Sequence, residues 1–138
     1  MSDGQQIYDG FIPGRYPIDA YGDGGFRFAE MSHRGSIVIL PSGIHAWRRD
    51  ETAAVSRESL EQDFNLILDI IRQEAHEIDF LFVGTGNNVV LPTNTLKQKL
   101  IESGIRSDFM QTGSALRTYN SLFEEQRRIA MAVIAVQN

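Results

Sequence analysis

Two kinds of apolar pattern alternate along the chain from residue 56 to residue 136, and this alternation constrains the fold more than any other feature. Apolar residues at intervals of three and four predict a helix over residues 57–76. The short, continuous apolar run over 79–83 instead predicts a strand that is covered on both faces. A second helix is expected after Pro92, and a second strand over 105–110.

A third helix is expected to open at Ser114, and the segment 129–136 follows it. That segment is apolar on every face: its Ala and Met residues favour a helix, but its length and its β-branched residues favour a central strand, which we prefer. Alternation of helices and strands implies a sheet with helices packed on it. We therefore expect a three-layer α/β fold, with a central mixed, mostly parallel sheet flanked by helices and an additional N-terminal β layer.

The first third of the chain has a β pattern. Asp23-Gly24-Gly25 indicates a tight turn between two short strands, since glycine accepts a positive φ without steric cost. Ser36–Leu40 is a β-branched apolar run that ends at Pro41. We thus expect one domain over residues 1–138, with an irregular arm (1–16), a β meander (17–47) and an alternating helix–strand core (56–136).

Composition excludes several classes of function. The chain has no cysteine, which excludes disulfides, thiolate metal sites and a cysteine nucleophile. A net charge of −5 repels a phosphate backbone, so no nucleic-acid partner is expected. The start has no signal-peptide pattern, and no apolar run reaches the roughly 18 residues of a membrane span, so we expect a soluble cytoplasmic protein. His33, His45 and His76 lack metal-ligand spacing, so neither a metal nor a cofactor is expected.

The first candidate ligand site is the loop Gly84-Thr85-Gly86, which follows a buried strand. Ligands of open α/β sheets tend to lie beyond the carboxyl ends of strands, and successive free N–H groups there can hold an anion. The longer glycine spacing of a nucleotide-binding loop is absent. A tight turn that requires a positive φ explains the same residues.

The second candidate is the loop Thr112-Gly113-Ser114, which also lies at the end of a strand and opens a helix. The free N–H groups and dipole of a helix start attract anions, and Arg117 is placed to reach back to one. Ordinary capping of the helix by Thr112 or Ser114 is the alternative. Tyr119 shares the apolar face of this helix, and we expect it in the core with its hydroxyl hydrogen-bonded.

No catalytic motif stands out in the sequence. Ser42, His45 and Asp50 contain the residue types of a Ser-His-acid triad, but no Gly-x-Ser-x-Gly elbow accompanies them. The sequence therefore names no reaction, and a non-catalytic role is favoured.

Several short motifs, in this order and spacing, resemble a known family. They are Tyr21-Gly22-x-Gly24-Gly25-Phe26, the strand that ends in Gly84-Thr85-Gly86, and the run Arg117-Thr118-Tyr119-Asn120 followed by an apolar tail. The chain resembles, from about residue 15 on, the small α/β domains of unknown function that include the adipogenesis-associated Mth-domain protein and a mitochondrial respiratory complex I assembly factor. The resemblance implies the three-layer fold, a final strand inserted antiparallel within the sheet, and a role in assembling membrane complexes.

Two functions remain open at this point. The first is a non-catalytic interaction or assembly domain with protein partners, supported by the wide apolar face of the helix over 57–76, which is also a candidate surface for a homo-oligomer. The second is a small-molecule or anion-binding domain, with or without enzyme activity, that uses the loops 84–86 and 112–114 together with Arg117.

Overall fold

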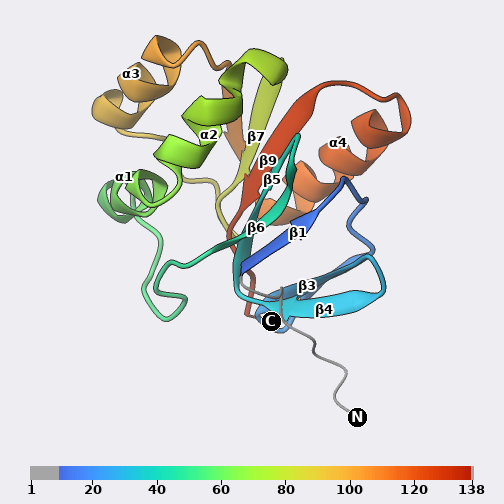
Figure 1. Cartoon of the computed structure of the whole chain (residues 1–138). Coiled ribbons are helices and arrows are strands. Elements are labelled where there is room, and N and C mark those ends of the chain that lie inside the picture. Colours follow the sequence, from blue (N-terminus) through green and yellow to red (C-terminus); the bar gives the residue numbers. More distant parts are fainter. Residues whose placement is uncertain (1–9, 138) are drawn as a thin grey trace.

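A computed structural model describes residues 10–137 (Figure 1). Six strands form the central sheet, in the order β1 (Phe11–Pro13), β6 (Gly43–Trp47), β5 (Ser36–Leu40), β9 (Ile129–Val133), β7 (Phe80–Gly84) and β8 (Ser107–Met110). A separate antiparallel sheet contains β2 (Ala20–Gly22), β3 (Gly25–Phe28) and β4 (Met31–Arg34). The helical elements are α1 (Arg57–Asn65), α2 (Leu68–Glu74), the 3-10 segment η2 (Ala75–Glu77), α3 (Asn94–Glu102) and α4 (Thr112–Glu124).

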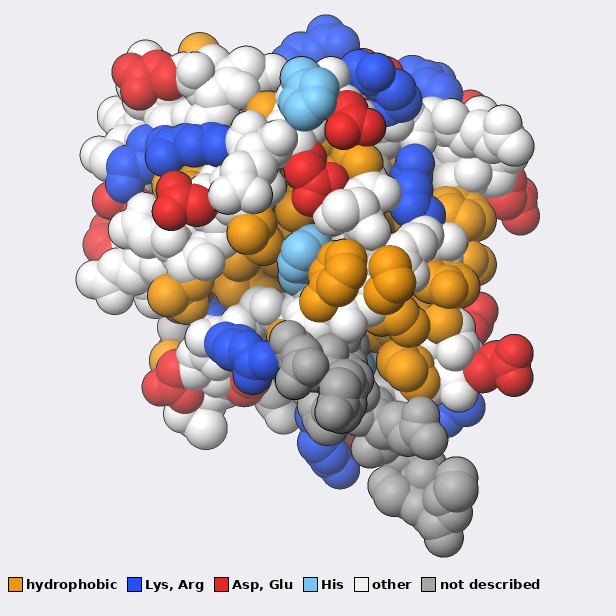
Figure 2. Space-filling model, in the orientation of Figure 1, with side chains coloured by type: hydrophobic (Ala, Val, Ile, Leu, Met, Phe, Trp, Pro, Cys, Tyr) orange, Lys and Arg blue, Asp and Glu red, His pale blue; other side chains and the backbone are white. Residues whose placement is uncertain are grey.

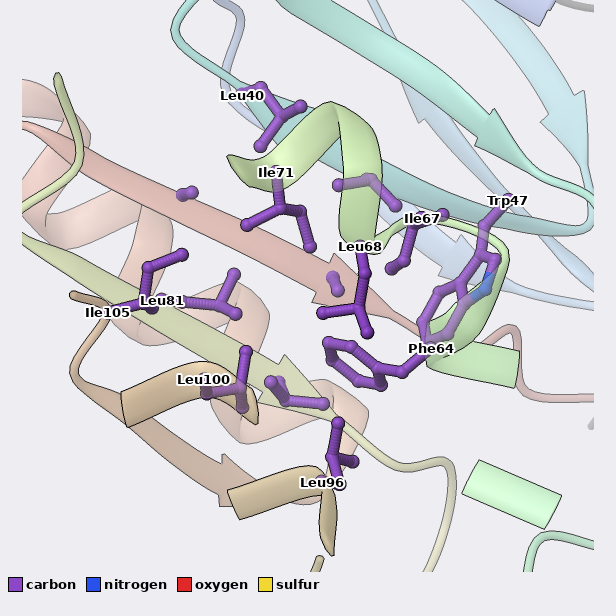
Figure 3. Close-up of a cluster of buried hydrophobic side chains, with 14 of the residues drawn as sticks. Leu40, Trp47, Phe64, Ile67, Leu68, Ile71, Leu81, Leu96, Leu100 and Ile105 are labelled. Carbon is purple, nitrogen blue, oxygen red and sulfur yellow. The ribbon is translucent and has the colours of Figure 1, made fainter. Parts of the chain in front are cut away.

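The central sheet is covered on both faces, as expected. Helices α1, α2 and α3 lie on one face and α4 lies on the other (Figure 1). Figure 3 shows the first of these two cores, where the buried Trp47, Phe64 and Leu81 meet side chains from the helices. The second core joins α4 to the small sheet β2-β3-β4 through Phe26, Tyr119 and their neighbours. The three-layer fold with its extra β sheet is thus confirmed.

The central sheet is mixed, but parallel pairing is confined to β7, β8 and β9. Strand β7 pairs in parallel with both β8 and β9, and the other three pairings of the sheet are antiparallel. The expected parallel majority is therefore wrong. The reason is that the β5–β6 hairpin and β1 extend the central sheet and do not belong to the separate β layer. The final segment is a strand, as predicted; β9 is antiparallel to β5 and parallel to β7.

The tight turn predicted in the first third is present. Asp23 and Gly24 have φ values of 51° and 82°, the left-handed conformations of a two-residue hairpin turn, and they join β2 to β3. The irregular arm predicted over 1–16 is partly wrong, because β1 lies within it and pairs with β6. Residues 1–9 of that arm lie outside the described part of the chain.

The single helix predicted over 57–76 is broken in the structure. Its start is as expected: Ser56 caps α1, and its side chain accepts a hydrogen bond from the Ser59 N–H. The helix stops after Asn65, and α2 begins at Leu68. The break lets both Ile67 and Leu68 reach the core, whereas Leu66 is 59% exposed. Leu66 thus lies at the break between the two helices, on the surface.

A buried histidine in the small sheet makes the fold sensitive to acid. His33 on β4 is 6% exposed. Burial, with the positive charge of Arg48 as a smaller cause, lowers the pKa of His33 to about 4. An unfolded chain binds this proton near pH 6.5, so between pH 6.5 and pH 4 the unfolded state carries more protons than the folded one. Stability supplied by neutral His33 is present above pH 6.5 and is lost as the pH falls.

We expect the free energy of unfolding of the wild type to drop, between pH 7 and pH 4.5, by about 2 kcal/mol more than that of a His33→Gln variant. The comparison removes the contribution of carboxylates, which titrate in both proteins. Urea unfolding at several pH values in this range measures the difference. Parallel pH profiles for the two proteins would contradict the assignment of this acid sensitivity to His33.

Candidate functional site

The two loops singled out in the sequence meet at the carboxyl ends of β7 and β8. The Gly86 N–H donates to Thr112 Oγ1 at 2.9 Å, and the Thr112 N–H donates to the Gly86 carbonyl, also at 2.9 Å. Gly84 permits this contact, because a Cβ at that position would lie 2.8 Å from Thr112 Cα. The end of β7 and the start of α4 are therefore in direct backbone contact.

The threonine hydroxyls of both loops are used inside the protein. Thr112 is fully buried, and its hydroxyl donates to the Ile134 carbonyl at 2.7 Å. Thr85 is 2% exposed; its hydroxyl donates to the Asn88 carbonyl at 2.7 Å and accepts from the Val90 N–H at 3.0 Å. These two side chains hold the loops in shape and present no free hydroxyl to a ligand.

Neither Thr112 nor Ser114, the two capping residues considered from the sequence, is the N-cap of α4. The N-cap is Gln111, whose side chain makes no capping hydrogen bond. Thr112 is the first helical residue, and the Ser114 hydroxyl accepts instead from Nη2 of Arg117 at 3.3 Å. Tyr119 agrees with the prediction: it is fully buried, and its hydroxyl donates to the Tyr16 carbonyl at 2.9 Å. Burial raises the pKa of Tyr119 to about 12, so the hydroxyl stays protonated.

A small polar pocket of about 150 Å³ lies where the loops converge. Three of the seven predicted site residues line it: Gly86, Gly113 and Arg117. Thr85, Thr112, Ser114 and Gly84 do not. The pocket is also lined by Tyr21, Asn87, Gln111 and Val136. A guanidinium beside a helix start is an arrangement that suits a small anion, and for this chain such binding remains a prediction.

A buried polar network, which sequence reasoning missed, lies beside the same loops. Arg49, with its side chain 2% exposed, donates to Glu51 and Asp63, each at 2.8 Å. Glu51 also accepts from the N–H and hydroxyl of Ser36, and the Ser36 hydroxyl accepts from the Ala135 N–H at 2.9 Å. The network joins segments up to 99 residues apart. No local sequence pattern marks these residues, because the contacts that bury them come from distant segments.

The candidate triad does not form. The Ser42 hydroxyl lies 3.3 Å from Nε2 of His45, but it donates at 2.6 Å to Glu74. Asp50 accepts from Thr52 instead. A serine whose proton is directed at a carboxylate is not activated by the histidine, so this cluster lacks the geometry for nucleophilic catalysis. Within residues 10–137, no group of three or more acidic or histidine side chains is placed to hold a metal ion.

A large, mainly apolar groove of about 1090 Å³ lies along β8. Three of its side chains are large, hydrophobic and mostly exposed: Val89 at 53%, Leu91 at 61% and Ile101 at 60%. We call this surface the β8 groove. It is lined by Ser56, Arg57, Phe80, Val89, Val90, Leu91, Pro92, Asn94, Lys97, Leu100, Ile101, Ile105, Arg106, Ser107, Asp108 and Phe109.

The groove was not predicted, although one signal for it is present in the sequence. Leu96, Leu100 and Ile101 have the spacing of one apolar face of their helix, yet only Leu96 and Leu100 are buried. Val89-Val90-Leu91 is an apolar run that belongs to no helix or strand of the structure. Such a run in a connecting segment, next to Pro92, is the pattern that marks this surface.

The contacts of Thr112 predict a specific stability difference. Thr112→Val keeps the shape of the side chain but leaves the Gly86 N–H and the Ile134 carbonyl buried without this partner, which we expect to cost about 2–4 kcal/mol of unfolding free energy. Thr112→Ser retains the hydroxyl and should cost about 1 kcal/mol for the lost methyl group. Urea unfolding compares the three proteins. Equal losses in the two variants would show that the hydroxyl is not what joins the loops.

Comparison with known proteins identifies relatives over most of the chain. This chain is 32% identical over 122 residues to an uncharacterised protein of Rhodobacter capsulatus, and the match covers 88% of this chain and 86% of that protein. It is 25% identical over 120 residues to the NADH dehydrogenase (ubiquinone) 1 alpha subcomplex assembly factor 3 of Xenopus tropicalis. That match covers 87% of this chain but only 61% of the frog protein, so the chain spans less than two thirds of it.

Solved structures agree with the fold. An outer membrane protein from Bartonella henselae superimposes with a TM-score of 0.76 and 44% identity, over 90% of this chain and 98% of that one. A Mth938-like domain protein from Bordetella pertussis superimposes with a TM-score of 0.66 and 25% identity, over 87% of this chain and 85% of that one. Residues 18–134 match the family described as protein of unknown function (DUF498/DUF598). Since these residues make up most of the chain, the protein belongs to the DUF498/DUF598 family and has the Mth938-like fold.

Proposed function

We propose that this protein is a non-catalytic, cytoplasmic protein-binding domain that assists the assembly of a multisubunit complex. The observation that carries the proposal is the β8 groove, where the residues Val89, Leu91 and Ile101 are each more than half exposed within one concave, largely apolar surface. Exposed apolar surface gathered in this way is typical of sites that bind proteins. Covering these side chains with a partner removes them from water, which stabilises the complex.

Other partner classes fit the surface less well. On the face drawn in Figure 2, acidic and basic side chains of the described residues are interspersed, which is unlike the basic stripe of a nucleic-acid-binding protein. The net charge of −5 also disfavours a nucleic-acid partner, because it repels a phosphate backbone. The described residues contain no helix with the length and hydrophobicity that crossing a membrane requires.

One relative supports an assembly role. The frog relative is an assembly factor for NADH dehydrogenase. We extend that role to this chain as part of the proposal: its partner is a subunit of a respiratory membrane complex, held during assembly. The match covers only 61% of the frog protein, so the β8 groove, and not the relative's name, is the basis for the experiment below.

The pocket between the loops favours a second candidate function, small-anion binding. Arg117 and the start of α4 line it with Gly86. If the site operates, millimolar inorganic phosphate should raise the unfolding temperature of the wild type, and Arg117→Gln should abolish the shift. Differential scanning fluorimetry measures this. A phosphate shift that Arg117→Gln abolishes would support the second candidate, and an unchanged unfolding temperature of the wild type would rule it out.

The groove itself is tested with charge placed on its exposed apolar wall. We expect the double variant Leu91→Glu/Ile101→Glu to keep the wild-type unfolding free energy within about 0.5 kcal/mol, because both side chains are exposed. In proximity labelling in the native organism, it should lose the proteins that the wild type labels. The matched control is Leu66→Glu, since Leu66 is equally exposed at 59% but lies at the end of α1, outside the groove.

An unchanged set of labelled proteins in the groove variant would overturn the proposed function. A loss caused by Leu66→Glu alone would instead place the interface on the helical segment 57–76, where self-association was considered. Size-exclusion chromatography with light scattering of the three purified proteins reports any change in the number of copies.

A further inference from the structure

The β8 groove contains an open strand edge. Strand β8 is last in the sheet and pairs only with β7 among the described strands. The Leu81 N–H donates to the Arg106 carbonyl, and the Thr85 N–H donates to the Met110 carbonyl, each at 2.8 Å. Carbonyls of successive residues in a strand point to opposite sides, so the N–H and carbonyl groups of Ser107 and Phe109 point away from β7. Both of these residues line the groove.

The two faces of β8 differ in chemistry. Phe109 packs into the core under α1, α2 and α3. Side chains on the same face of β8 as Phe109 therefore point toward α3 and the exposed wall formed by Val89, Leu91 and Ile101. Met110 packs into the opposite core, and Asp108 and Arg106 share its side of the strand. A strand laid along β8 would therefore place every second side chain against the apolar wall.

The charges around the groove specify the partner further. The side chains that line it include three basic groups, Arg57, Lys97 and Arg106, and one acidic group, Asp108. This local excess of positive charge stands out on a chain whose net charge is −5. An apolar strand with acidic residues at its ends complements both the wall and the basic groups.

We propose that the β8 groove binds an extended segment of a partner protein as an additional strand on β8, with alternating apolar residues against the Val89–Leu91–Ile101 wall and acidic residues at its ends. This inference rests on the proposed function and names the mode and the partner chemistry. Main-chain hydrogen bonds to Ser107 and Phe109 supply affinity, and the wall and the basic groups supply specificity.

A second copy of this chain is a poorer occupant. Pairing two β8 edges would bring two surfaces with the same excess of positive charge together, which opposes association. The short β8 strand offers few main-chain hydrogen bonds to offset that repulsion. A foreign strand with acidic ends meets the same short edge, but its charges attract the basic groups and do not repel them.

The test uses a synthetic peptide, Glu-Glu-Val-Thr-Val-Thr-Val-Glu-Glu, labelled with fluorescein and titrated with the full chain by fluorescence anisotropy. We expect it to bind at least tenfold more tightly than the same peptide with lysines at both ends, and binding should weaken with salt. Amide hydrogen exchange at Ser107 and Phe109 should slow at least tenfold when the peptide is bound.

Three variants separate the edge from the wall. Ser107→Pro removes an N–H that points away from β7, so the sheet keeps its own hydrogen bonds, and peptide binding should weaken at least tenfold. Leu91→Glu should weaken binding to a similar extent by adding negative charge to the wall, whereas Leu66→Glu should leave it unchanged. Circular dichroism confirms folding; if Ser107→Pro fails to fold, the exchange rates of wild-type Ser107 and Phe109 decide whether a strand is added.

Three results would overturn strand addition. They are equal affinity for the acidic and lysine-flanked peptides, peptide binding with no protection of the Ser107 and Phe109 amides, and a wild-type dimer that Ser107→Pro dissociates, which would make a second copy the occupant. If any of these occurs while Leu91→Glu/Ile101→Glu still loses its labelled partners, the protein-binding function stands and only its mode is wrong. If the labelled partners also stay unchanged, both proposals fail.

Discussion

The close contact between the end of β7 and the start of α4 is the constraint on which the rest of the structure depends. Thr112 accepts a hydrogen bond from the Gly86 N–H and donates one to the Ile134 carbonyl, and all of these groups are buried. One side chain thus joins the loop after β7, the first residue of α4 and the chain beyond β9. The absence of a Cβ at Gly84 is what lets the two backbones approach so closely. Packing is thus sufficient to require glycine at position 84.

The order of elements after residue 56 follows from the sequence because it depends on local periodicity. The apolar stripe, the caps at Ser56 and Thr93, and the glycine after α3 each act over a few residues. What the sequence did not reveal depends on long-range contacts. Strand β1 forms because β6 offers it an edge, and the helix breaks near Leu66 because Ile67 and Leu68 both find room in a core built from distant segments.

The candidate site was predicted only in part, for the same reason. Two loops at the carboxyl ends of neighbouring parallel strands must lie close together, so their meeting was foreseeable from the alternation alone. Which atoms they present was not foreseeable. The acceptors are the Asn88 carbonyl, from the loop itself, and the buried Ile134 carbonyl, from the segment after β9, and they engage the hydroxyls of Thr85 and Thr112 inside the protein. The Arg49 network also depends on a long-range contact, since Glu51 binds Ser36 and the Ser36 hydroxyl accepts from the Ala135 N–H, 99 residues away.

The two edges of the central sheet indicate why the β8 groove is the better place to look for function. Strand β1 contains Pro13, which lacks an N–H and is typical of edges that do not pair. Strand β8 has no proline, and its outward N–H and carbonyl groups lie beside exposed apolar side chains. Its charged neighbours, Arg106 and Asp108, discourage indiscriminate pairing, yet the basic excess around the groove admits an acidic strand. A strand edge that selects its partner by charge suits the binding of a specific protein. This role explains the edge better than simple protection from aggregation does.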